Sequence, residues 1–300
     1  LTPSNREDFF TFTRMLIGQL RQVGKTHTAE RYVTVMNSFG RFRRENELLW
    51  EEVDSDLMVE YETYLKSRGV CPNTSSYYMR GLRAIYNRAV EKGKTVQREP
   101  FKYVYTGIDK TIKRAVPLKV IRQIRDLDLT LFPTMDFARD IFMFSFYTRG
   151  MSFIDMAYLK KKDLQGGTLS YRRQKTGQQL FVKWEKPMQE IVDKYNTNGT
   201  PYLLPIIRDM NADIRRQYKN AAHLVNDKLK KLGEKLGLTV PLTSYVARHG
   251  WASIARSRNI PLAIISEAMG HDSEKTTRIY LASLDTTSVD KANSRILKAL

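Results

Sequence analysis

Apolar residues in the first third of the chain recur every three or four positions, which is the spacing of one face of a helix. The first such run extends from Phe9 to Leu20 and follows Ser4 and Glu7, which form a capping box. The same spacing predicts three further helices, at about residues 29–42, 54–69 and 73–93. Four successive helices with no strand signal between them indicate a helical domain.

The periodicity stops between residues 95 and 116. This stretch contains Pro100, Gly107 and a short basic run, and it shows no regular pattern. We interpret it as a linker with a domain boundary near residue 110. A length of 300 residues favours two domains. We therefore expect a helical domain with its linker at 1–109 and a second domain at 110–300.

A short β segment interrupts the helices of the second half. Apolar and polar residues alternate on both sides of Lys175-Thr176-Gly177, and Gly166-Gly167 opens the segment. The pattern predicts a β-hairpin whose tip lies near Lys175. Helices are expected around it at about 118–127, 135–146, 187–196, 211–236, 243–257 and 261–269, with a helical turn around Tyr280 and a last helix at 287–299. The predicted fold class is mainly α with a small β-sheet.

The charge of the chain indicates a polyanionic partner. Lys and Arg total 50 against 32 Asp and Glu, which gives a net charge of +18. Nucleic acid is the leading candidate and an anionic membrane the second, while a merely basic protein is the plain alternative. In the helix predicted at 73–93, Arg80 and Arg83 lie mostly off the apolar face. They are candidate DNA-binding residues, and a solvated basic face is the structural alternative.

Several classes of protein are excluded by composition. The single cysteine, Cys71, excludes an internal disulfide framework and fits a reducing cytoplasm. The sequence shows no signal peptide and no apolar run long enough to span a bilayer. It lacks a Cys/His cluster or an acidic triplet with ligand spacing, so neither a metal nor another cofactor is expected. Because the chain starts at Leu1 rather than Met, we expect that an N-terminal segment has been removed.

Cleavage of a DNA phosphodiester without metal requires three kinds of group. A nucleophile must lie in line with the phosphorus, cationic donors must hold the non-bridging oxygens, and a proton must reach the leaving 5′-oxygen. Arginine suits the second task because its planar fork binds two phosphate oxygens. The segment 242–252 reads LTSYVARHGWA, Met269-Gly270-His271 follows it, and Tyr280 lies nine residues further.

These residues resemble the catalytic motifs of the tyrosine recombinase, or phage integrase, family. The second catalytic box of that family reads His-x-x-Arg-His, followed by Leu-Gly-His and, nine residues later, by Tyr. Arg248, His249, Gly270, His271 and Tyr280 match this pattern in register. The resemblance implies that Arg248 clamps the scissile phosphate, that His271 donates a hydrogen bond to it and that Tyr280 attacks it. Each residue alone would be interpreted as structural, as we interpret His249, and the common spacing favours catalysis for the other three.

The match departs from the family in two places. Tyr245 stands where the family usually has the histidine of the second box. A phenol is a poor base at neutral pH. A subset of bacterial mobile-element integrases looks similar at this position, with Tyr-Val-Ala-Arg-His. The first catalytic box of the family reads Thr-Gly-Leu-Arg-Ile-Ser-Glu. Gly150 and Asp155 match its glycine and its acid, but Ser152 takes the place of its arginine. On a helix Arg149 would lie about one turn from Ser152, so we favour Arg149 as the phosphate ligand.

The rest of the chain resembles the same family. Lys175 matches the lysine of its Lys-Thr-Gly hairpin, which protonates the leaving 5′-oxygen. Residues 4–94 resemble its helical, SAM-like core-binding domain by length, helix count and the Tyr-x-x-x-Leu-Arg-x-Ile pattern of 78–85. The resemblance implies a two-domain DNA clamp in which the basic linker joins the two parts.

The resemblance also implies the reaction and the partners. It predicts a site-specific recombinase that cleaves and rejoins double-stranded DNA through a 3′-phosphotyrosyl bond, needs no cofactor, and acts in the cytoplasm at the nucleoid. The enzyme would be a monomer when free and a homo-tetramer on two DNA sites, with helix 287–299 packed on a neighbour. Two alternatives remain: a type IB topoisomerase, and a DNA-binding protein whose active site has decayed at Ser152 and Tyr245.

Overall fold

The computed structural model describes residues 8–44, 46–109, 115–281 and 297 of the chain. It divides into two compact units, residues 1–111 and residues 112–300, each with its own hydrophobic core. The two units are described separately below.

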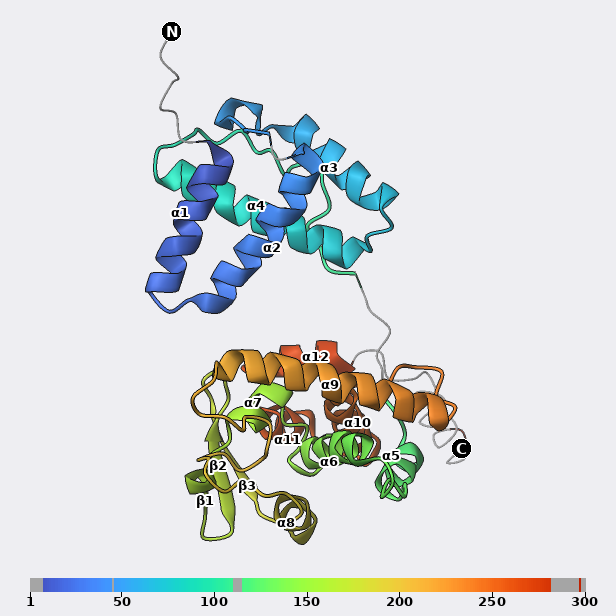
Figure 1. Ribbon diagram of the computed structural model, residues 1–300. Helices are drawn as coiled ribbons and strands as arrows, with labels where there is room; N and C mark the ends of the chain where they lie inside the picture. The colour runs from blue at the N-terminus through green and yellow to red at the C-terminus, as the bar shows by residue number, and fades with distance from the viewer. Residues whose placement is uncertain (1–7, 45, 110–114, 282–296, 298–300) are drawn as a thin grey trace. The chain divides into compact units, whose positions relative to one another are not determined.

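The first unit is a bundle of four helices (Figure 1). Asp8 caps the first helix by accepting a hydrogen bond from the Thr11 N–H at 2.9 Å, whereas the predicted capping residues Ser4 and Glu7 lie outside the described residues. Asp54 caps the third helix in the same way. The helices are α1 (Phe9–Gln22), α2 (Thr26–Arg43), α3 (Ser55–Ser67) and α4 (Pro72–Glu91), with a 3₁₀ turn, η1 (Trp50–Glu52), before α3.

The core of this unit is rich in aromatic side chains. Phe9, Phe39 and Tyr61 are almost fully buried, and the Phe39 and Tyr61 rings meet edge to face at 4.9 Å. The Tyr61 hydroxyl donates to Ser38 Oγ at 2.8 Å, which satisfies the polar end of a buried phenol. The helical run predicted from Phe9 to Leu20 therefore forms the buried face of α1.

The segment that follows α4 is held against the helices as far as Asp109. The Tyr105 N–H donates to Glu62 at 2.8 Å, and Asn73 and Asp109 exchange two hydrogen bonds. Ser76 Oγ donates to the Gly107 carbonyl at 2.5 Å. A Cβ at position 107 would lie 2.7 Å from the Tyr105 ring, so glycine lets this ring pack directly on the backbone. Much of the predicted linker thus belongs to the surface of the first unit.

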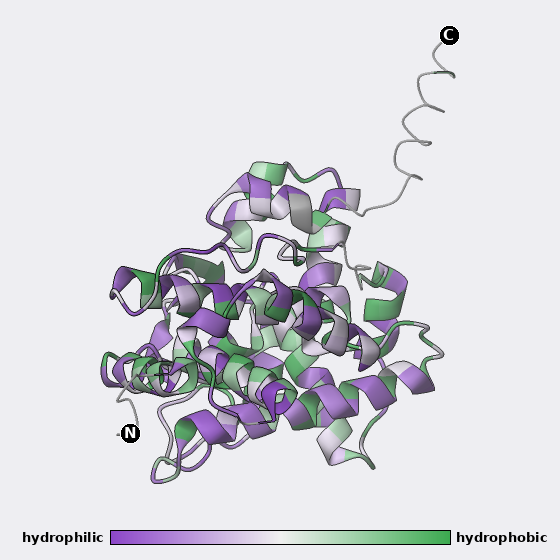
Figure 2. Ribbon diagram, turned by 90° about the horizontal axis from the view of Figure 1, so that it is seen from above, coloured by the Kyte–Doolittle hydropathy of each residue, from purple (hydrophilic) through white to green (hydrophobic). Residues whose placement is uncertain are grey.

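The second unit is built around helix α6 (Pro133–Tyr147). This helix packs against α9 (Ile214–Lys235), α10 (Ser244–Ser257), α8 (Lys186–Asp193) and α5 (Leu118–Arg125). It buries apolar side chains on more than one face, as a central helix must. Figure 2 shows that most helices of the molecule carry hydrophilic and hydrophobic residues side by side, as amphipathic helices do. The remaining elements are α7 (Phe153–Tyr158), η2 (Lys161–Asp163), α11 (Leu262–Ala268) and α12 (Glu274–Leu281).

An antiparallel three-stranded sheet lies beside these helices (Figure 1). Strand β2 (Thr168–Arg172) pairs with β3 (Gln179–Lys183) and with the two-residue strand β1 (Leu164–Gln165). Leu169 and Tyr171 face the core opposite Val182 and Leu180. The predicted hairpin with Lys175 at its tip is confirmed, and so is the fold class, mainly α with a small sheet. The short elements β1 and α7 were not predicted, because neither is long enough to show a period.

Candidate active site

Arg248 is buried in the first half of α10 and is held by two distant carbonyls. Its side chain is only 4% exposed. Nη1 donates to the Gly150 carbonyl at 2.8 Å, and Nη2 donates to the Met269 carbonyl at 2.7 Å. Gly150 has φ +78°, and a Cβ there would lie 2.8 Å from Arg248 Cα, so only glycine permits this approach. The guanidinium is therefore fixed in a well-defined position.

His271 lies next to this guanidinium, directly after α11. Its Nε2 is 2.9 Å from Arg248 Nη2, and its Nδ1 is 2.7 Å from Thr277 Oγ1. Burial and, to a smaller extent, the positive charges of Arg248, Arg173 and Lys175 together lower the pKa of His271 to about 4. The imidazole is thus neutral at neutral pH.

A second arginine, Arg173, is buried next to the same turn. It is 7% exposed, and Nη1 donates to the Gly270 carbonyl. Its Nε has no hydrogen-bond partner among the described residues. Gly270 has φ +61°, and a Cβ there would lie 2.9 Å from Leu180 Cδ1, so the hairpin can pack directly on this glycine.

Arg173 was not among the residues predicted from the sequence, although its position in the strand pattern provides a signal. In β2 the inward residues are Leu169 and Tyr171, and the same alternation continues to Arg173, while Arg172 is exposed. An arginine in the core-facing register of a strand is rare unless it has a partner or a function. This position marks Arg173 as a candidate functional residue.

Arg149 does not occupy the helical position that the sequence suggested. Helix α6 ends at Tyr147, and Arg149 has φ +63°, in the left-handed region, so it is not one helical turn from Ser152. Its Nη1 donates to the Phe181 carbonyl of β3 at 3.2 Å. A non-glycine residue held in this conformation is often part of a functional site.

The pKa of the buried Tyr171 is affected by the charges of Asp155 and of three arginines, so these side chains all lie near its phenol. Burial and the negative charge of Asp155 raise its pKa, while Arg248, Arg173 and Arg149 act in the opposite direction. The fold thus gathers three arginines from three separate segments around one side chain. Such a cluster can hold the non-bridging oxygens of a phosphate.

Ser152 and Asp155 have a bracing role in this site. Ser152 Oγ donates to Asp155 Oδ2 at 2.5 Å and caps the start of α7. Asp155 Oδ1 accepts from the Gln174 N–H at 2.8 Å, next to Arg173 and Lys175 in the hairpin. Asp155 therefore braces the hairpin.

The remaining predicted residues of this unit lie on the surrounding elements. Lys175 is exposed at the hairpin tip, close enough to His271 to affect its pKa. Tyr245, in the first turn of α10, is 55% exposed, and its ring packs edge to face on His249 at 4.6 Å. Tyr280 lies in α12, and its side chain is outside the described part of the chain. The helix predicted at 287–299 also lies outside the described residues, apart from position 297.

Arg80 and Arg83 lie on α4 of the first unit. Arg80 Nε donates to the Ser76 carbonyl at 3.3 Å, and Arg83 Nη1 donates to Thr106 Oγ1 at 3.4 Å. Arg83 thus lies beside the segment that follows α4, whereas the bond of Arg80 stays within the helix.

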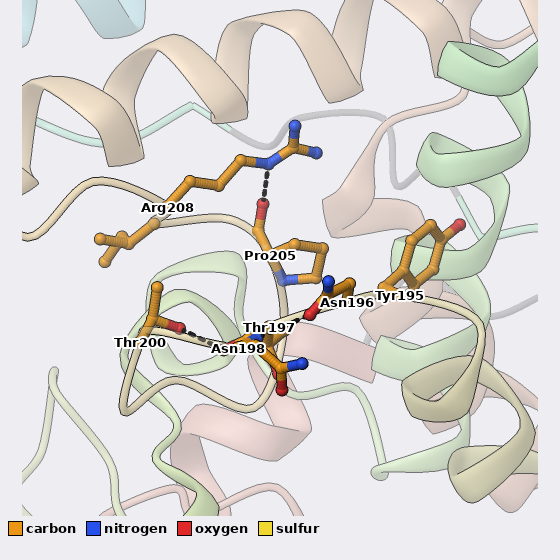
Figure 3. Close-up of a pocket in the computed structure, with 8 residues that line it drawn as sticks. Tyr195, Asn196, Thr197, Asn198, Thr200, Pro205 and Arg208 are labelled. Atoms are coloured by element: carbon orange, nitrogen blue, oxygen red, sulfur yellow. Dashed lines mark hydrogen bonds between the residues drawn. The ribbon is translucent and has the colours of Figure 1, made fainter.

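A surface pocket in the loop between α8 and α9 has no part in this cluster. Figure 3 shows Arg208 Nε donating to the Pro205 carbonyl, at 2.9 Å, within a lining of neutral polar side chains. The lining residues are Tyr195, Asn196, Thr197, Asn198, Thr200, Pro205, Ile207 and Arg208. Among the described residues no group of three or more His, Cys, Asp or Glu side chains could hold a metal ion. In the same part of the chain, no helix is both long and apolar enough to cross a bilayer.

Comparisons with known proteins agree over both units. Residues 133–287, more than half of the chain, match the phage integrase family, and residues 8–111 match the phage integrase SAM-like domain. Tyrosine recombinase XerC of Syntrophus aciditrophicus is 26% identical over 281 residues, covering 86% of this chain and 87% of XerC. Tyrosine recombinase XerA of Pyrococcus furiosus is 26% identical over 178 residues, and the match covers 58% of each chain.

A solved structure has the same fold. A lambda integrase tetramer bound to a Holliday junction is similar with a TM-score of 0.70 and 14% sequence identity, covering 92% of this chain and 78% of that chain.

Proposed function

This chain belongs to the phage integrase family of tyrosine recombinases, and we propose that it cleaves and rejoins double-stranded DNA at specific sites, with Tyr280 as the nucleophile. The family and enzyme class predicted from the sequence are thereby confirmed. The observation that carries the proposal is the contact between the buried Arg248, on α10, and the half-buried His271, in the turn between α11 and the helix of Tyr280.

Arg248 would hold the scissile phosphate. A guanidinium fixed by two carbonyls keeps further N–H donors and a permanent positive charge in a buried site, where an electrostatic interaction is strong. His271 would donate a hydrogen bond to the same phosphate. Tyr245, which lies one helical turn before Arg248, would contact the phosphate through its hydroxyl.

Arg149 and Arg173 would provide the charge that Ser152 lacks. The side chain of Ser152 is engaged by Asp155, so it does not replace an arginine. Arg149 remains our proposed phosphate ligand at this position. Arg173 supports it as a buried cation that also acts on Tyr171, and the Arg173 Nε–H has no acceptor among the described residues.

The proposed reaction uses these residues in one step. The Tyr280 hydroxyl loses its proton to water as its oxygen attacks the phosphorus, a 3′-phosphotyrosyl bond forms, and the bond from phosphorus to the 5′-oxygen breaks. Lys175, on the hairpin tip, protonates the leaving oxygen. Attack by a 5′-hydroxyl from a partner strand reverses the step, and no nucleotide cofactor is needed because the phosphotyrosine conserves the bond.

The partners belong to the same proposal. The net charge of +18 suits duplex DNA. We propose domain bounds at 1–109 and 110–300, and the first of these domains would contribute Arg80 and Arg83 to the DNA contact. The lambda integrase similar to this chain was solved as a tetramer on a Holliday junction, and we extend that arrangement to a homo-tetramer of this chain on two sites, formed from free monomers. Action on cellular DNA would place the enzyme in the cytoplasm, at the nucleoid.

A suicide-substrate assay tests the proposal. Incubation with a nicked DNA site should trap a covalent protein–DNA adduct, and Tyr280→Phe should abolish the adduct while it leaves DNA affinity unchanged. An adduct formed by the Phe variant would show that another residue is the nucleophile. Strand exchange between two sites would separate recombination from relaxation of one duplex, and a parent protein that binds DNA without any adduct would support the decayed-site alternative.

A further inference from the structure

The two ring nitrogens of His271 have different partners. Nε2 lies 2.9 Å from Arg248 Nη2, and a guanidinium can only donate hydrogen bonds. Nε2 must therefore accept, which leaves the single proton of the neutral ring on Nδ1. That N–H donates to Thr277 Oγ1 at 2.7 Å.

Contact with a phosphate requires the opposite arrangement of this ring. A phosphate oxygen only accepts, so Nε2 must carry a proton to bond it. In the DNA-free protein, burial and the charges of Arg248, Arg173 and Lys175 lower the pKa of His271 to about 4, so the ring is neutral when it meets the phosphate. A neutral His271 can serve the phosphate only as its other tautomer.

We propose that Thr277 is a positioning residue that allows His271 to exchange tautomers when DNA binds. The inference rests on the proposed phosphate contact of His271. A threonine hydroxyl both accepts and donates. In the complex the ring loses its Nδ1 proton and gains one on Nε2 by exchange with water, so its charge stays zero. The Thr277 hydroxyl then turns to donate to Nδ1, Nε2 donates to the phosphate, and the Arg248 Nη2 N–H that had donated to Nε2 donates to the phosphate instead.

The location of Thr277 suits this role. Its side chain is 0% exposed, so bulk water does not reach the hydroxyl. Thr277 also lies on α12, three residues before Tyr280, and its bond to His271 ties the helix of the nucleophile to the phosphate-binding group. Loss of the buried hydrogen bond between Thr277 and His271 would therefore disturb the position of both α12 and the His271 ring.

Two substitutions separate the hydroxyl from the packing of the side chain. Thr277→Val keeps the branched shape but has no hydroxyl, whereas Thr277→Ser keeps the hydroxyl and loses a methyl group. We expect Thr277→Val to slow single-turnover adduct formation by about tenfold or more, as loss of a buried hydrogen bond implies, and Thr277→Ser to stay within about threefold of the parent. A Val variant as fast as the parent, or a Ser variant as slow as Val, would overturn the proposal.

Nitrogen chemical shifts provide a readout that a purely structural role would not change. With ¹⁵N-labelled histidine, of which the chain has four, the free Tyr280→Phe protein should show His271 protonated on Nδ1. The DNA complex of the same protein should show protonation on Nε2. An unchanged tautomer in the complex would refute the exchange even if the Val variant failed to fold.

Failure of this inference differs from failure of the proposed function. If the parent protein forms no adduct, the recombinase proposal fails. If the parent forms adducts that need Tyr280 while Thr277→Val reacts equally fast, only the role of Thr277 fails.

Discussion

Replacing Arg149 by glycine tests whether its guanidinium holds the phosphate. Arg149 is held at φ +63°, a conformation that costs a non-glycine residue about 1–2 kcal/mol and that glycine adopts freely. Glycine loses about 0.5–1 kcal/mol in backbone entropy on folding, and the partly exposed bond to the Phe181 carbonyl contributes a similar amount. These contributions nearly cancel, so we expect the free energy of unfolding to change by less than about 1 kcal/mol.

The expected effect on catalysis is much larger. Removing one charged donor from a site that stabilises developing negative charge costs about 3–4 kcal/mol, or about 100- to 1,000-fold in rate. Arg149→Gly should therefore form adducts on a suicide substrate about 100-fold or more slowly, while its Tm and its affinity for DNA stay close to those of the parent.

The chain provides a matched control in Arg44. This residue follows α2 with φ +54° and belongs to the first unit, whereas the arginine cluster belongs to the second. Arg44→Gly should show the same small change in stability and no loss of cleavage. The reasoning about Arg149 is refuted if Arg149→Gly cleaves at the rate of Arg44→Gly. The double variant Arg149→Gly with Ser152→Arg should recover part of the activity, at a stability cost of about 1 kcal/mol from the lost cap of α7.

The other two predictions concern the buried arginines. Arg248→Ala should lower adduct formation by at least about 100-fold, because the phosphate loses the buried guanidinium that binds it. Recombination within tenfold of the parent would exclude this role. Arg173→Met keeps most of the apolar contact with Leu180 and Gly270 but removes the charge, so we expect cleavage to fall about tenfold or more; normal cleavage with a lowered Tm would instead assign Arg173 to holding the hairpin on Gly270. Both variants should be compared in single-turnover assays with DNA affinity and Tm measured in parallel.

Local patterns determined much of the fold. The apolar run from Phe9 to Leu20 became the buried face of α1, and the alternation around Lys175 became the β2–β3 hairpin. Both follow from spacing along a short stretch of chain, where a helix or strand brings side chains to one face whatever lies elsewhere. The motif at Arg248, His271 and Tyr280 identified the family for a similar reason, since its register is visible without any contact.

Other features depended on contacts between distant segments. Arg149 was expected on a helix, but α6 ends at Tyr147, Arg149 lies in the left-handed region, and the next residue, Gly150, contacts Arg248 from far along the chain. The burial of Arg173 depends on Gly270, which lies far along the chain, and the tautomer of His271 depends on Arg248 and Thr277 together.

The sequence by itself thus determined most of the helices, the hairpin, the family and the order of the proposed catalytic residues, because these follow from local periodicity and spacing. Only the tertiary structure decided which cations surround Tyr171, how Ser152 is used by Asp155, and which ring nitrogen of His271 carries the proton. Each of these is set by burial and by hydrogen bonds between segments that the chain order separates, and a linear pattern does not encode such distances.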